Sequence, residues 1–179
     1  MAADYLISSL QPLDPDGAAP VTLARFLEAC AEQLPAAQAE AIAAAVAPER
    51  PAAAPGWSVA AQWRDLEDQI RNAVAAERAR AQGLDPAKWR RPVDGCSLYW
   101  ANRVAAAFQE KDPARRDRLL DQVRWDAAGE LTPPASPLSA AAALTYAVRL
   151  SIVLRRQALS AEAGNEVFNR LTAATKLEF

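Results

Sequence analysis

The chain has 179 residues, of which 51% are hydrophobic, so it is long enough to bury one core and too apolar to be disordered throughout. Its 20 basic and 22 acidic residues give a formal net charge of −2, without the basic excess that is typical of nucleic-acid-binding domains. No apolar run is long enough to cross a membrane, and the first residues lack the basic flank and apolar stretch of a secretion signal, so we expect a cytoplasmic protein.

The N-terminal third predicts helices after one extended segment. Residues 5–10 are apolar and β-tolerant and precede a turn-rich stretch, which predicts a short N-terminal strand or arm. Thr22 is a candidate helix N-cap, because apolar residues follow it at the three-and-four spacing of one helical face as far as Leu34. A second helix is expected over Ala36 to Val46. Residues 48–56 are rich in proline and alanine and predict an exposed linker.

The rest of the chain predicts further helices. The longest runs from a Ser58 cap to Gln82, and Gly83 stands where helices commonly end. An aspartate followed by proline starts two more, at residues 85–86 and 112–113, and a helix over residues 97–109 lies between them. The last two are expected over residues 139–159 and from residue 160 onward. We therefore predict an all-α, single-domain bundle over residues 1–179, with about six to eight helices, some of them long and amphipathic.

The side chains available for chemistry are few. The chain contains no histidine, which removes imidazole bases, imidazole metal ligands and the usual nucleophile–histidine pairs. Cys30 and Cys96 stand far apart, so we expect no thiolate zinc site and, in the cytoplasm, no disulfide. The glycines are scattered singly, without a phosphate-binding loop. We expect no catalytic residue, no cofactor, no metal and no small-molecule substrate, so the chain is predicted not to be an enzyme.

Four polar residues of the longest predicted helix are candidates for a special role: Arg71, Asn72, Glu77 and Arg78. Glu77 falls near the apolar stripe, where a carboxylate paired with an arginine is a better explanation than an active-site acid. We interpret the four as a structural polar network that ties the helix to its neighbours. A contact with a binding partner is the alternative.

The five tryptophans lie in the middle of the chain, and most are expected to fill the core. Trp57 and Trp89, with Arg90 and Arg91, are the candidate surface anchors, because tryptophan and arginine dominate the energetics of protein interfaces. Basic residues beside an aromatic ring can also bind nucleic acid. Acidic residues interleave with them here, so contact with an acidic protein surface is the preferred interpretation.

Several short motifs run through the chain in order: residues 5–12 (YLISSLQP), residues 26–30 (FLEAC), Ile70-Arg71-Asn72 followed by Arg78, and residues 146–150 (YAVRL) followed by Gly164 and Phe168. Together they resemble a bacterial family of unknown function whose members are encoded among the subunits of V-type (archaeal-type) ATPases. The resemblance implies a non-catalytic part of a rotary ATPase, similar in role to the C or d subunit, the helical socket between the central stalk and the membrane rotor ring.

The same resemblance implies other ATPase subunits as partners, no nucleic acid, and a cytoplasmic position at the inner face of the membrane through those partners. The chain departs from the expected pattern in its linker at residues 48–56 and in being short for a three-lobed socket. Two alternatives stay open. One is an ATPase assembly factor, and the other is an unrelated helical adaptor that binds proteins or nucleic acid.

Overall fold

The structure is a computed structural model that describes residues 2–47, 49, 56–93, 95–159 and 161–175. Over these residues the chain is all-α, as predicted, and has no strand. The predicted linker at residues 48–56 lies almost wholly outside the described residues. The helices, in chain order, are α1 (Ala2–Ser9), α2 (Leu23–Gln33), α3 (Ala36–Val46), α4 (Ser58–Ala81), the 3-10 helix η1 (Pro86–Trp89), α5 (Leu98–Phe108), α6 (Pro113–Gly129), α7 (Ala140–Ala158) and α8 (Ala161–Thr175).

The predicted strand at residues 5–10 is wrong, because these residues belong mostly to α1. Ala3, Leu6, Ile7 and Leu10 recur at three-and-four spacing and pack on the core, with Leu6 only 1% exposed. A short apolar run fits a strand and a helix equally well by itself. Contact with α2 and α7 selects the helix here.

Three helices start at the predicted caps Thr22, Asp85 and Asp112, and α5 starts next to Ser97, its predicted first residue. The side chains of Thr22, Asp85, Ser97 and Asp112 each accept a hydrogen bond from a backbone N–H two or three residues further along the chain. Ser58 differs from the prediction, since it is the first residue of α4 and not its cap. Local sequence thus places helix starts to within about one residue.

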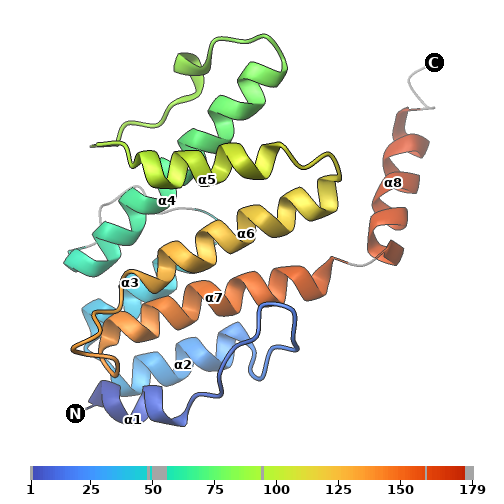
Figure 1. Cartoon of the computed structure of the whole chain (residues 1–179). Helices are drawn as coiled ribbons and strands as arrows, with labels where there is room; N and C mark the ends of the chain where they lie inside the picture. The colour runs from blue at the N-terminus through green and yellow to red at the C-terminus, as the bar shows by residue number, and fades with distance from the viewer. Residues whose placement is uncertain (1, 48, 50–55, 94, 160, 176–179) are drawn as a thin grey trace.

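The helices form two groups, which are joined by α6 and by a direct contact between α3 and α4 (Figure 1). In one group α1, α2 and α3 contact α7, and in the other α4 contacts η1 and α5. The buried side chains form a single cluster with members from α1 to α7. Trp63, Trp100 and Trp125 are buried in it, as predicted for most of the tryptophans, whereas Leu119 of α6 is 45% exposed.

The last helix, α8, lies apart from the other helices (Figure 1). Val167, Phe168 and Leu171 form an apolar face of this helix, and all three side chains are exposed. Neither α8 nor any other described helix combines the length and apolar character needed to cross a membrane.

Candidate basic groove between α4 and α6

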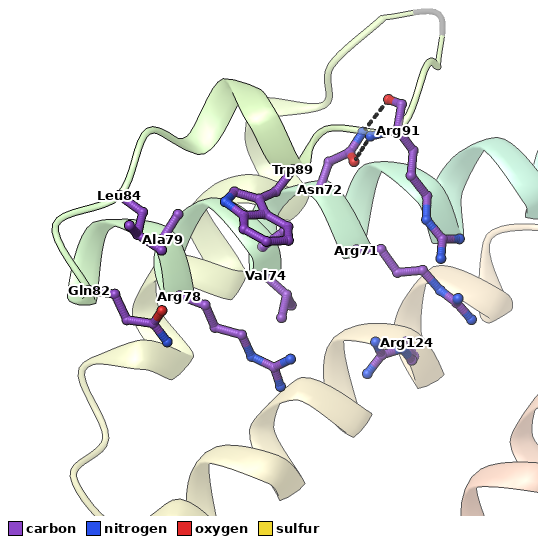
Figure 2. Close-up of a pocket in the computed structure, with 11 residues that line it drawn as sticks. Arg71, Asn72, Val74, Arg78, Ala79, Gln82, Leu84, Trp89, Arg91 and Arg124 are labelled. Atoms are coloured by element: carbon purple, nitrogen blue, oxygen red, sulfur yellow. Dashed lines mark hydrogen bonds between the residues drawn. The ribbon is translucent and has the colours of Figure 1, made fainter.

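The described surface contains a groove of about 530 Å³ that combines positive charge with an exposed indole (Figure 2). It lies along the C-terminal half of α4, between the segment that follows this helix and α6. We call it the basic groove and define it by its lining residues: Arg71, Asn72, Val74, Ala75, Arg78, Ala79, Gln82, Leu84, Trp89, Arg91 and Arg124.

One face of α4 forms the floor of the basic groove. Arg71, Ala75, Arg78 and Gln82 line it at intervals of three or four residues, which places them on the same side of the helix. The helix of 24 residues is about 36 Å long, and both α5 and the 3-10 helix η1, which follows it in the chain, pack against it.

The segment that follows α4, residues 84–93, runs back along this helix, and we call it the returning segment. The chain turns back at Gly83, which has a φ of +68°. The Leu84 N–H donates to the Ala79 carbonyl oxygen at 2.8 Å, and the Gly83 N–H donates to that of Arg80 at 3.1 Å. This is the Schellman arrangement that satisfies the last carbonyls of a helix, and it needs a left-handed residue such as glycine. The predicted helix end at Gly83 is confirmed, and the turn brings Leu84 and Trp89 onto the rim of the basic groove.

Asn72 fastens the returning segment to α4 (Figure 2). Its Nδ2 donates to the Arg91 carbonyl oxygen at 3.0 Å, and the Arg91 backbone N–H donates to its Oδ1 at 2.7 Å. The Asn72 side chain is buried, so both halves of its amide are satisfied by backbone groups 19 residues away. The interpretation of this residue as a structural tie matches the geometry.

Two carboxylates hold three of the groove's arginines. Arg71 Nε lies 2.6 Å from Glu67 Oε1, and Arg124 Nε lies 3.3 Å from both Glu67 oxygens. Arg91 reaches Asp68 Oδ1 at 3.3 Å. The Glu67 and Asp68 side chains are only 13% and 9% exposed and do not line the groove, so they lie behind the guanidinium groups that they orient.

Arg78 is the remaining cation of the basic groove, and it has no ion-pair or hydrogen-bond partner among the described residues. Four arginines against the carboxylates of Glu67 and Asp68 leave two uncompensated positive charges. Guanidinium groups bind carboxylates and phosphates through paired hydrogen bonds, and an exposed indole packs on apolar or flat groups. The arrangement is suited to an anionic occupant with an apolar part.

The structure brings together five of the predicted site residues: Arg71, Asn72, Arg78, Trp89 and Arg91 all line the basic groove. The other three lie elsewhere. Glu77 forms an ion pair with Arg80, which is the pairing with an arginine that the sequence favoured over an active-site role. Arg90 is exposed but does not line the groove, and Trp57, expected at the surface, is partly buried against the core.

The sequence did not single out Arg124, Gln82 or Leu84, which complete the basic groove. Gln82 and Leu84 flank Gly83, and the helix-end signal there could have drawn attention to them.

Both cysteines are free, with Cys30 buried and Cys96 exposed, as expected. No cluster of three or more potential metal ligands occurs among the residues that the structure describes. No family model, curated protein or solved structure matches this chain.

Proposed function

We propose that the chain is a non-catalytic component of a V/A-type rotary ATPase, which binds other subunits in the manner of the C/d-like socket between central stalk and rotor ring. The observation that carries the proposal is the placement of the motifs on which the family resemblance rests. Residues 5–12, 26–30 and 146–150 lie on or next to α1, α2 and α7, three helices that contact one another. The Tyr146 hydroxyl donates to the Gln11 carbonyl oxygen at 3.2 Å, and its ring centroid lies 5.0 Å from that of Phe26.

Motifs far apart in the chain therefore meet in one packed unit, which supports treating them as one pattern. Of the other residues of the resemblance, Arg71, Asn72 and Arg78 line the basic groove, Ile70 is buried, and Gly164 and Phe168 belong to α8. Exposed apolar side chains and arginine-rich grooves are typical of protein interaction sites. The proposal therefore also accounts for the two most unusual surfaces of the chain.

Affinity purification from the native cells tests the proposal. The tagged full-length chain is expected to co-purify in stoichiometric amounts with the central-stalk and rotor-ring subunits, and to be found with the membrane fraction through them. Deletion of the gene should uncouple ATP hydrolysis from ion transport. Complete and fully coupled ATPase isolated from the deletion strain would overturn the proposal.

An assembly factor for the same ATPase is the nearest rival, and the purification separates the two. Such a factor is expected in subcomplexes and absent from the finished enzyme. Quantitative mass spectrometry of the intact ATPase, resolved from subcomplexes on a native gel, gives the stoichiometry of the chain in each. A ratio near one per finished complex favours the subunit, and its absence there with presence in subcomplexes favours the assembly factor.

A further inference from the structure

We infer that the basic groove binds an acidic segment of a partner protein, with carboxylates on Arg78, Arg71 and Arg124 and an apolar side chain against Trp89. The inference rests on the proposed function only in taking the occupant to be a protein. It adds the chemistry by which that partner is recognised, and it does not require the partner to be an ATPase subunit.

The charge of the basic groove opposes that of the whole molecule. The chain carries a formal net charge of −2, whereas the groove keeps two positive charges that Glu67 and Asp68 do not compensate. Arg78, which has no partner among the described residues, extends from the floor of the groove towards α6 (Figure 2). A concentrated positive patch on an acidic protein attracts an acidic group to this one place.

Arg71 and Arg124, which both pair with Glu67, keep their terminal guanidinium nitrogens available to a ligand. Both contacts with this carboxylate use Nε, and the terminal nitrogens of Arg71 and Arg124 make no hydrogen bond within the described part of the chain. A guanidinium held by one edge is fixed in orientation and can donate two parallel hydrogen bonds from its remaining nitrogens to a carboxylate. Glu67 thus preorganises two binding groups with a single side chain, which lowers the ordering cost of binding.

The apolar side of the basic groove selects an occupant with an apolar side chain. Trp89 is 60% exposed and Leu84 is 46% exposed, and both face the same space as Val74 and Ala79. An isolated phosphate ion would leave this side uncovered. The volume of about 530 Å³ lies in the range of sites that enclose small ligands or a few side chains, so a short peptide segment fills it.

The amount of charge favours a peptide over nucleic acid. A nucleic-acid strand carries one negative charge per nucleotide and needs a continuous basic track. Here the groove is lined by four arginines, and the carboxylates of Glu67 and Asp68 compensate two of their charges, so it offers no continuous track. Two uncompensated charges next to an apolar wall match a segment in which a few acidic residues flank a leucine or phenylalanine.

Fluorescence polarisation on the full-length chain tests the inference. The probe is a short fluorescein-labelled peptide in which aspartate and glutamate alternate with leucine and phenylalanine, and the control peptide carries asparagine and glutamine in place of the acids. We expect saturable binding of the acidic peptide only, weakened by added salt. Arg78→Gln should weaken it by about tenfold, the effect of losing one charge-assisted contact, and Trp89→Ala by a similar factor.

Arg115→Gln is the matched control, because it removes the same charge from an arginine that is 75% exposed on α6, outside the basic groove. Binding should be unchanged in it. Equal binding of the neutral peptide, equal weakening by R78Q and R115Q, or preferential binding of a single-stranded oligonucleotide or inorganic phosphate would each overturn the inference. Since Arg78 is exposed and unpaired among the described residues, R78Q should fold normally.

The same variants separate this inference from the proposed function. If R78Q and the native chain co-purify equally with ATPase subunits and no acidic peptide binds, the inference is wrong while the proposed function stands. If the acidic peptide binds in the basic groove and no ATPase subunit co-purifies, the proposed function is wrong and the inference stands.

Discussion

Asp121 on α6 is 2% exposed and accepts hydrogen bonds from Arg155 Nη2 at 2.5 Å and from Arg156 Nε at 3.0 Å, both on α7. It joins the two helices. Removing it leaves Arg155 and Arg156 with only the exposed carboxylates of Asp117 and Asp16 as ion-pair partners among the described residues, in place of a buried one. We therefore expect Asp121→Ala to lower the free energy of unfolding by about 3 kcal/mol, measured by urea denaturation.

Asp117 provides the control for this substitution. Its side chain is 45% exposed and, within the described part of the chain, pairs only with Arg155, at 2.9 Å. Exposed pairs contribute little, so Asp117→Ala should cost about 1 kcal/mol or less. Similar losses in the two variants would show that burial of Asp121 does not determine the strength of this contact.

The two cysteines are expected to differ sharply in reactivity. Burial raises the pKa of the Cys30 thiol from 9.0 to about 11, while Cys96 is exposed. Only the thiolate attacks disulfides. At a pH of about 8, a chromogenic aryl disulfide should therefore modify Cys96 rapidly and Cys30 only when the protein unfolds. The absorbance of the released aryl thiol, recorded with and without urea, gives the number of thiols that react. Rapid reaction of the folded Cys96→Ser variant would contradict this.

The burial of Cys30 also predicts a pH dependence. The folded state keeps the thiol protonated up to about pH 11, whereas an exposed thiol loses its proton near pH 9.0. Between these values the folded state binds more protons, so the free energy of unfolding falls as the pH rises. A Cys30→Ala variant lacks this contribution. Relative to the urea midpoint of the variant, that of the native chain should therefore fall as the pH rises from 9.0 to about 11.

Residue-scale prediction from the sequence worked where the signal was local. Arg71 and Arg78 were named as polar residues of the longest predicted helix, and Trp89 and Arg91 as candidate surface anchors. Arg124 was missed because it meets Glu67 across 57 residues, and only the packing of α6 beside α4 brings the two together. Trp57 was assigned to the surface from its neighbouring prolines, which do not reveal that its ring packs on the core.

At the scale of single helices, two residues at helix starts provide a matched comparison. Thr22 Oγ1 accepts a hydrogen bond from the Arg25 N–H at 3.3 Å, so Thr22→Ala should destabilise the protein by about 1 kcal/mol. Ser139 stands at the same position of α7, but its side chain makes no cap bond, and its buried Oγ has no hydrogen-bond partner among the residues that the structure describes. Ser139→Ala should therefore cost nothing or slightly stabilise.

Thermal denaturation of the two variants distinguishes them. A lower melting temperature for T22A, with S139A equal to or above the native chain, is the expected result. A loss in S139A as large as that in T22A would mean that the Ser139 hydroxyl does cap α7 in solution.

The comparison also explains what the sequence could predict about the helices. Capping residues and Asp-Pro pairs act within one turn, so they located the starts of α2, η1, α5 and α6. They did not identify α1, whose apolar residues form a helix only because α2 and α7 cover one face of it. Likewise the exposure of Leu119 depends on how α6 is rotated against its neighbours, which its own sequence does not specify.

At the scale of the whole molecule, burial is concentrated around α7, whereas the two surfaces that we propose for binding lie away from this helix. Nine side chains of α7 are buried, and this helix contacts α1, α2, α3 and α6. The basic groove and the apolar face of α8 lie outside this buried region. A binding surface placed there can change or become ordered without disturbing the core.

Hydrogen exchange measured by mass spectrometry should show this gradient. Amides of α7 are covered on several sides and are expected to exchange only through global unfolding, whereas the described side chains of α8 contribute nothing to the buried cluster. Peptides from α8 should exchange about a hundredfold faster than those from α7, or more. Protection of α8 equal to that of α7 in dilute protein would contradict the arrangement, because its exposed Phe168 and Leu171 would then have to be covered. Protection that appears only when an ATPase subunit is added would instead identify α8 as a second contact surface.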